Sequence, residues 1–208
     1  MSVLFLFGDS ITYGAWDGQL SGWANQLRAY ADQRVFTDPD FYSLVYCLGI
    51  PGETTSGLVN RFKHETEARL RIGQENIFVF AYGANDAKFP KDQQIFTTAP
   101  ELFEKNLDQA ITEAKKYSKN IFLLGITPVI EEQVNARGKS LFYNKNVDQY
   151  NTIIKALADK QAVEFIDLSD KFGVADPKSL FDEDGLHPND KGHAIIFEAV
   201  KNKLEKLL

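Results

Sequence analysis

The sequence has one cysteine, three histidines and no long hydrophobic run among its 208 residues. Because Cys47 has no partner, no internal disulfide can form, and nothing calls for an oxidising compartment. Every apolar run is far shorter than the roughly 20 residues that a membrane-spanning helix needs. Basic residues are also few, with 23 Lys and Arg against 29 Asp and Glu. A nucleic-acid binder usually presents a basic face, so we expect no nucleic-acid partner and no stable membrane insertion.

The amino terminus has neither a basic region nor a cleavage site, so it does not read as a signal peptide. We therefore expect a cytoplasmic protein. The length suits one domain with a sizeable core, and 44% hydrophobic with 25% charged residues is ordinary for a soluble globular chain. Linkers, repeats and low-complexity stretches are lacking, so we expect a single domain over residues 1–208.

Five short apolar runs, rich in β-branched and aromatic residues, predict strands. They are Val3–Phe7, Tyr42–Cys47, Ile77–Tyr82, Ile121–Ile126 and Val163–Leu168. Apolar residues at helical spacing lie between them, most clearly over residues 100–118 and 150–158, and a last helix is predicted from near Asn189. This alternation predicts an α/β fold with a parallel sheet covered by helices on both faces.

Polar clusters follow four of these predicted strands. They are Gly8-Asp9-Ser10, Gly49-Ile50-Pro51-Gly52-Glu53-Thr54, Gly83-Ala84-Asn85-Asp86 and, on a long loop, Asp184-Gly185-Leu186-His187-Pro188-Asn189. The carboxyl ends of parallel strands meet at one edge of a sheet, which is where open α/β folds place their sites. We therefore expect the four clusters to lie together.

Serine hydrolysis needs a hydroxyl, a base, a group that orients the base, and donors for the oxyanion. Ser10 supplies the hydroxyl. Of the three histidines, His64 lies within a charged helical stretch and His193 lies inside the last helix, so His187 on the long loop is the candidate base. Asp184, three residues earlier, can fold back and accept from its imidazole.

The candidate oxyanion donors are the backbone N–H groups of Ser10 and Gly52 and the side-chain amide of Asn85. Gly52 suits this position because a residue without a side chain lets the backbone approach a ligand closely. Each motif has a plainer alternative: Ser10 can simply cap a helix, and the Asn85 and Asp184 segments can be turns. The presence of all four clusters after predicted strands favours a catalytic site over these plainer alternatives.

Taken together, these blocks resemble the GDSL/SGNH hydrolases, a family of esterases and lipases. The resemblance rests on Ser10 in Gly8-Asp9-Ser10, Gly52, Asn85 in Gly83-Ala84-Asn85-Asp86, and His187 in Asp184-Gly185-Leu186-His187, in the family's order. It spans nearly the whole chain, with Ile11 where the family name has leucine. The Gly-x-Ser-x-Gly elbow of α/β-hydrolases is lacking.

The resemblance implies a three-layer α/β/α sandwich, flavodoxin-like, with five parallel strands in the order 2-1-3-4-5. It implies Ser10 as nucleophile, His187 as base and then acid, Asp184 as its orienter, and Ser10, Gly52 and Asn85 as the oxyanion hole. The expected enzyme is a serine esterase acting on small or medium carboxylic esters, with no metal or cofactor. Asp9 and Asp86 are expected to support the loops.

Two substrate classes stay open at this point, acetyl groups on carbohydrates and the acyl chains of lysophospholipids or thioesters. Outside this class, the alternative is a binding module without activity on the same fold. Four aromatic residues near the clusters, Tyr13, Trp16, Trp23 and Phe89, can line a substrate pocket or simply pack in the protein.

Overall fold

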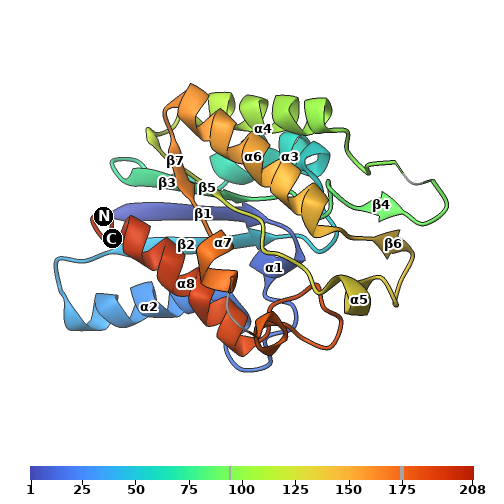
Figure 1. Ribbon diagram of the computed structural model, residues 1–208. Helices are drawn as coiled ribbons and strands as arrows, with labels where there is room; N and C mark the ends of the chain where they lie inside the picture. The colour runs from blue at the N-terminus through green and yellow to red at the C-terminus, as the bar shows by residue number, and fades with distance from the viewer. Residues whose placement is uncertain (94, 174–175) are drawn as a thin grey trace.

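The centre of the molecule is a five-stranded parallel sheet with the order β2-β1-β3-β5-β7, seen in a computed structural model that describes residues 1–93, 95–173 and 176–208 (Figure 1). The strands are β1 (Ser2–Gly8), β2 (Ser43–Gly49), β3 (Glu75–Ala81), β5 (Asn120–Leu124) and β7 (Glu164–Ile166). They coincide with the five predicted runs to within a few residues. The predicted order, with the second run beside the first at one edge, is confirmed.

Helices cover both faces of this sheet and complete the three layers. One face carries α3 (Thr55–Glu67), α4 (Pro100–Ala114) and α6 (Asn144–Gln161), and the other carries α2 (Trp23–Thr37) and α8 (Asp190–Leu204) (Figure 1). Shorter elements lie in the connections: α1 (Ser10–Tyr13), α5 (Glu131–Val134), α7 (Ser169–Phe172) and the 3-10 turn η1 (Pro177–Leu180). The predicted α/β/α sandwich is therefore present.

β1 shows why its apolar run is unbroken. Side chains alternate across a strand, so Phe5 and Phe7 enter the core beneath α3 and α4, while Leu4 and Leu6 enter the core beneath α2 and α8. All seven residues of β1 are buried, as expected for a central parallel strand covered on both faces. The tightly packed core fixes the carboxyl end of β1, and α1 begins just beyond it at Ser10.

Two features of the fold differ from the sequence-based expectation. The long connections after β3 and β5 each contribute a two-residue strand, β4 (Phe89–Pro90) and β6 (Ser140–Leu141), which pair antiparallel. Strands this short carry no periodic pattern. Cys47 lies within an apolar run of the sequence, yet it is only half-buried because β2 is an edge strand.

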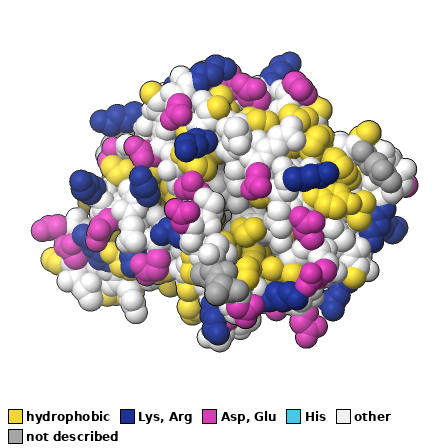
Figure 2. Space-filling model, in the orientation of Figure 1, with side chains coloured by type: hydrophobic (Ala, Val, Ile, Leu, Met, Phe, Trp, Pro, Cys, Tyr) yellow, Lys and Arg dark blue, Asp and Glu magenta, His cyan; other side chains and the backbone are white. Residues whose placement is uncertain are grey.

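The surface is mixed in charge. On the face shown in Figure 2, Lys and Arg side chains are interspersed with Asp and Glu. Within the three described ranges, none of the helices combines the length and the apolar character needed to cross a bilayer. The two chain ends lie near each other, at the amino end of β1 and far along that strand from Ser10 (Figure 1).

Candidate active site

Ser10 lies at the carboxyl end of β1, where the chain turns into α1. Asp9 caps this helix, because its Oδ1 accepts a hydrogen bond from the Ile11 N–H at 2.9 Å. Ser10 is therefore not the cap. Its Oγ instead lies 2.8 Å from Nε2 of His187.

His187 and Asp184 form the next link. Nδ1 of His187 lies 2.5 Å from Oδ2 of Asp184. Oδ1 of Asp184 accepts from the backbone N–H groups of Leu186 and His187, both at 2.9 Å. Burial alone would raise the pKa of the Asp184 carboxyl, but the His187 ring and the two N–H groups hold that pKa well below its usual range. Asp184 is thus ionised at neutral pH and fixes the ring by accepting from Nδ1.

The loop that carries this pair is tied to α8. The carbonyl oxygen of His187 accepts from the Asp182 N–H at 2.9 Å. Asn189 caps α8 with Oδ1 and donates from Nδ2 to the carbonyls of Ser179 at 3.0 Å and Phe181 at 3.1 Å. One asparagine therefore joins the start of α8 to the segment that precedes the loop.

Gly52 occupies a tight turn beyond β2. The Glu53 N–H donates to the Ile50 carbonyl at 3.1 Å, with Pro51 second and Gly52 third in the turn. Gly52 has φ of +80°, the left-handed value that a type II turn requires there and that glycine adopts without strain. The Ile50 N–H donates to the Gly8 carbonyl at 2.9 Å, so this turn is fastened to the end of β1, beside Ser10.

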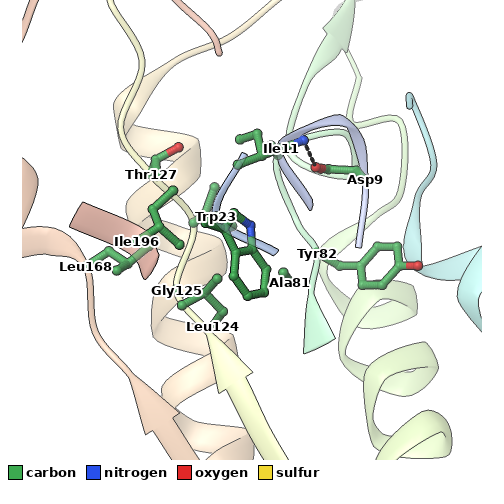
Figure 3. A pocket seen from close by; sticks show the side chains of 12 residues that line it. Asp9, Ile11, Trp23, Ala81, Tyr82, Leu124, Gly125, Thr127, Leu168 and Ile196 are labelled. Carbon is green, nitrogen blue, oxygen red and sulfur yellow. Dashed lines mark hydrogen bonds between the residues drawn. The ribbon is translucent and has the colours of Figure 1, made fainter. Parts of the chain in front are cut away.

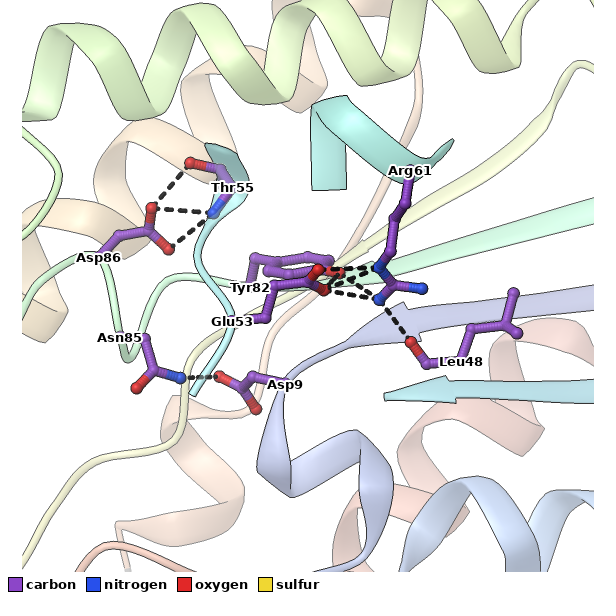
Figure 4. A network of polar contacts seen from close by, with 8 residues as sticks. All are labelled: Asp9, Leu48, Glu53, Thr55, Arg61, Tyr82, Asn85 and Asp86. Atoms are coloured by element: carbon purple, nitrogen blue, oxygen red, sulfur yellow. Dashed lines mark hydrogen bonds and ion pairs between the residues drawn. The ribbon is translucent and has the colours of Figure 1, made fainter. Parts of the chain in front are cut away.

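A buried ion pair anchors the residue after Gly52. Arg61 of α3 donates to the Glu53 carboxylate through Nε at 2.9 Å and Nη2 at 2.6 Å, and the Tyr82 hydroxyl donates to the same carboxylate at 2.6 Å (Figure 4). Arg61 also reaches the Leu48 carbonyl at 2.6 Å. The Arg61 and Glu53 side chains are only 14% and 10% exposed. Although burial acts to lower the pKa of Arg61, its bond to Glu53 raises that pKa overall.

Asn85 follows β3 and is 7% exposed. Its Nδ2 donates to Oδ2 of Asp9 at 3.1 Å, and its Oδ1 accepts from Nζ of Lys88 at 2.9 Å (the Asp9 bond is drawn in Figure 4). The chain enters this segment through Gly83, whose φ is +136° and where a Cβ would lie 2.4 Å from Ile126. Only glycine fits there.

Asp86 and Asp9 support the loops, and both are buried. Asp86 accepts from the Thr55 N–H at 3.0 Å and the Thr55 hydroxyl at 2.7 Å, and so replaces a side-chain cap on α3 (Figure 4). Burial raises the pKa of both carboxyls, that of Asp9 to about 6. The expected supporting role of the two aspartates matches these contacts.

A small cavity lies beneath this edge of the sheet, with Asp9 and Ile11 on its upper side (Figure 3). Its volume is about 30 Å³, and its wall is mainly apolar. Ala81, Leu124, Ile126 and other side chains of both sheet faces complete the lining, together with the indole of Trp23. Space of this size holds about two water molecules or a small group.

The other two histidines lie where the sequence placed them. His64 is exposed on α3. His193 is fully buried in α8, where Nδ1 accepts from the Trp23 N–H at 3.3 Å and Nε2 lies 3.3 Å from the Ala15 carbonyl. Burial lowers the pKa of His193, which keeps the ring neutral and structural.

The four aromatic residues near the site have different surroundings. Trp23 belongs to the core, and Phe89 packs on Phe96 with ring centroids 4.8 Å apart. Tyr13 is exposed, and Trp16 is 64% exposed while its ring stands edge-on to that of His187 at 5.7 Å. Trp16 is thus the aromatic residue in contact range of the His187 ring.

Sequence reasoning missed Lys88 and the Glu53–Arg61–Tyr82 cluster. Neither has a motif, because each depends on which side chains the fold brings together. The available signals were weak: Lys88 lies three residues after Asn85, and Glu53 directly follows Gly52.

Comparisons with solved structures support the fold. A lipase/acylhydrolase from Enterococcus faecalis matches with a TM-score of 0.78 and 20% identity, covering 100% of this chain and 97% of that one. An acetylxylan esterase from Geobacillus stearothermophilus matches at 0.70 and 21%, covering 98% and 93%. TesA matches at 0.71 and 21%, covering all of both chains. At such identities the likeness shows a shared fold.

No curated protein sequence matches this chain significantly. A family model does match: the one described as the GDSL-like Lipase/Acylhydrolase family covers residues 6–195, nearly the whole sequence and all four polar clusters. The resemblance noted in the sequence is therefore confirmed, and with it the prediction of a carboxylic ester hydrolase. The chain belongs to the GDSL-like lipase/acylhydrolase family.

Proposed function

We propose that the protein is a serine esterase in which Ser10 attacks the ester, His187 transfers the proton and Asp184 orients His187. The observation that carries this proposal is the unbroken chain from Ser10 Oγ to His187 Nε2 at 2.8 Å and from His187 Nδ1 to Asp184 Oδ2 at 2.5 Å. A nucleophile, a base and an orienting carboxylate in hydrogen-bond contact are what acyl transfer requires.

In the first step, His187 Nε2 takes the proton of Ser10 as Oγ bonds to the ester carbonyl carbon. The ionised Asp184 accepts from Nδ1, which keeps Nε2 unprotonated before attack and stabilises the imidazolium afterwards. His187 then gives the proton to the departing alcohol, and an acyl-serine remains. Water then attacks the acyl carbon while His187 takes its proton; the bond from that carbon to Ser10 Oγ breaks, His187 returns the proton to Oγ, and the acid leaves.

The negative charge on the carbonyl oxygen needs donors already in position. The proposed donors are the N–H groups of Ser10 and Gly52 and one Nδ2–H of Asn85. Neither backbone N–H donates to any acceptor in the described ranges. One Nδ2–H of Asn85 donates to Asp9, which leaves the second Nδ2–H available for the oxyanion. Loss of one such donor typically lowers turnover by about 10²–10³.

A binding module without activity is the competing function. It requires a pocket but gives no reason for an ionised Asp184 to hold His187 against a serine hydroxyl. Family membership also favours the enzyme.

For the substrate, we propose a short acyl group. The acyl pocket in this proposal is the cavity lined by Asp9 and Ile11, the two neighbours of Ser10; its volume of about 30 Å³ has room for an acetyl group and not for a long chain. The fold shared with an acetylxylan esterase is consistent with this choice, whereas a lysophospholipid or a long-chain thioester would need a deeper apolar channel.

The first experiment tests the nucleophile. Purified protein is expected to hydrolyse p-nitrophenyl acetate and to be labelled by a fluorophosphonate at Ser10. Ser10→Ala should abolish both while the thermal unfolding midpoint stays close to that of the wild type, and Ser140→Ala serves as the matched control. Labelling at any residue other than Ser10 would overturn the assignment.

A second experiment tests the acyl group. The value of kcat/KM is measured for p-nitrophenyl acetate, butyrate, octanoate and palmitate. We expect the highest value for acetate or butyrate and a steep fall beyond. A maximum at octanoate or longer would contradict the short-acyl proposal and leave the serine mechanism intact.

A further inference from the structure

Lys88 is a half-buried cation beside the site with no role in the steps above. It lies three residues past Asn85, and its Nζ donates to Oδ1 of Asn85 at 2.9 Å. None of the ion pairs within the described ranges includes it. An ammonium withdrawn from water without a paired carboxylate is costly, so its position calls for an explanation.

The backbone presents Lys88 rigidly. Its carbonyl accepts from the Thr97 N–H at 2.9 Å and from the Thr97 hydroxyl at 3.1 Å. One residue earlier, the Ala87 carbonyl accepts from Nδ2 of Asn146 in α6 at 3.1 Å, and the Ala87 N–H donates to Gly83 at 2.8 Å. Segments distant in sequence therefore fix the point from which the lysine side chain extends.

The Asn85 amide is consequently held at both ends. Nδ2 faces the Asp9 carboxylate at 3.1 Å, and Oδ1 faces the Lys88 ammonium. A flipped amide would set its oxygen against the carboxylate and its N–H groups against the ammonium, so both contacts would become repulsive. Together the two charged groups select one amide orientation.

We propose that Lys88 is a positioning residue for the reaction: its ammonium holds the Asn85 amide in the orientation that leaves one Nδ2–H for the oxyanion. The proposal rests on the proposed function of Asn85. The charge adds a second effect, since an amide whose oxygen accepts from a cation is polarised and its N–H becomes a stronger donor. Asp9 alone would contact the amide through Nδ2, but only Lys88 places a cation on Oδ1.

Burial of Lys88 is consistent with this role. It lowers the pKa of the ammonium, while the carboxylates of Asp9 and Asp86 act in the opposite direction. The negative charges of these two groups offset part of the cost of burying the cation, although neither forms a direct ion pair with it.

The test uses two substitutions of Lys88 and one control. Lys88→Met removes charge and donor, Lys88→Gln keeps a neutral donor, and Lys105→Met removes an exposed charge from α4. For p-nitrophenyl acetate we expect Lys88→Met to lower kcat and kcat/KM together by about 10-fold to 100-fold, as loss of a contact made in the transition state does. Lys88→Gln should keep more activity than Lys88→Met, and Lys105→Met should match the wild type.

A double-variant cycle tests whether Lys88 acts through Asn85. In the Asn85→Ala background, Lys88→Met should cause little further loss, because the group that it orients is gone. Equal activity of Lys88→Met and Lys105→Met, or the same fold-loss with and without Asn85, would overturn the proposal. Labelling of Ser10 by the fluorophosphonate in every variant shows separately that the serine assignment stands.

Discussion

The two halves of the candidate site are held in place by different means. The sheet-end half consists of Ser10, Gly52 and Asn85, each just beyond a strand, at the ends of the adjacent strands β1, β2 and β3. The loop half consists of Asp184 and His187, which lie on the long connection between β7 and α8. The first half is fixed by buried charges, and the second by hydrogen bonds within a partly exposed loop.

This difference predicts how each half responds to mutation. The supports of the sheet-end half are core residues: Asp9 is 3% and Asp86 0% exposed, and both carboxylates accept hydrogen bonds from neighbouring segments. The Asp184 side chain is 28% exposed, and its backbone partners lie within three residues. Changes in the sheet-end half should therefore cost stability and activity together, whereas changes in the loop half should cost mainly activity.

The largest expected effect is on activity in the loop half. Asp184→Asn keeps an oxygen for the backbone N–H groups but loses the charge that selects the Nδ1–H tautomer of His187. We expect kcat/KM to fall by about 10³–10⁴. The free energy of unfolding should fall by only about 1.5–3 kcal/mol, the value of a hydrogen bond to a charged group, because the oxygen that accepts from the two N–H groups is kept. Ester hydrolysis and urea unfolding of the same preparation check both numbers.

A large loss of stability in Asp184→Asn would contradict the separation of the two halves. Unchanged hydrolysis would contradict the proposed role of Asp184 instead. The two outcomes are distinguishable because activity and unfolding are measured independently.

The next effect is on stability in the sheet-end half. Arg61→Met leaves the Glu53 carboxylate buried without its partner, and breaking a buried pair in this way costs about 3–5 kcal/mol. Because Glu53 follows Gly52, we also expect a fall in kcat as the turn loosens. Urea unfolding gives the first quantity and p-nitrophenyl acetate hydrolysis the second.

Two controls sharpen this result. Lys63→Met removes an exposed ion pair from the same helix and should have little effect on unfolding. The double variant Arg61→Met with Glu53→Gln should regain part of the lost stability, because no unpaired charge remains. If the double variant is less stable than Arg61→Met alone, the loss comes from packing and not from the carboxylate.

The sequence could predict the strands and their order for a specific physical reason. A parallel strand buried on both faces must be apolar at nearly every position, so β1 and β3 stand out as runs. β4 and β6, with two residues each, leave no such trace. Pro51 and Gly52 also have the backbone preferences of the two central positions of a type II turn, so this turn has a local cause in the sequence.

The candidate site could be predicted as far as its residues follow strand ends or share a short loop. Asp184 and His187 lie three residues apart, so their contact is local. Lys88 and Arg61 could not be found in this way, because a lysine or an arginine at these positions looks like a solvated surface residue. Only the packing of α3 and of the segment after β3 brings them to Glu53 and Asn85.

The third prediction separates the two halves by pH. Burial raises the pKa of Asp9 to about 6, and the negative charge of Asp86 adds to this. A carboxyl whose pKa is higher in the folded state holds its proton there after the unfolded chain has lost it. Stability from Asp9 should therefore fall as the pH rises from about 4 to about 6, by roughly 3 kcal/mol in total.

Asp184 acts with the opposite sign in a different range. Its pKa is lowered in the folded protein, so the stability that it contributes is present above the unfolded pKa of about 4 and is lost only as the pH falls below that value. Urea unfolding of the wild type and of both variants is therefore compared between pH 3 and pH 7.5, since the difference between two curves isolates one group. Relative to the wild type, Asp9→Asn should lose less stability as the pH rises from about 4 to about 6, and Asp184→Asn should lose less as the pH falls below about 4. The slope is the relevant quantity for Asp9→Asn, because asparagine has one oxygen for the two donors, Ile11 and Asn85, and loses a hydrogen bond at every pH. If the free energies of unfolding of the wild type and Asp9→Asn change in parallel between pH 4 and pH 6.5, the pH dependence in this range does not come from Asp9.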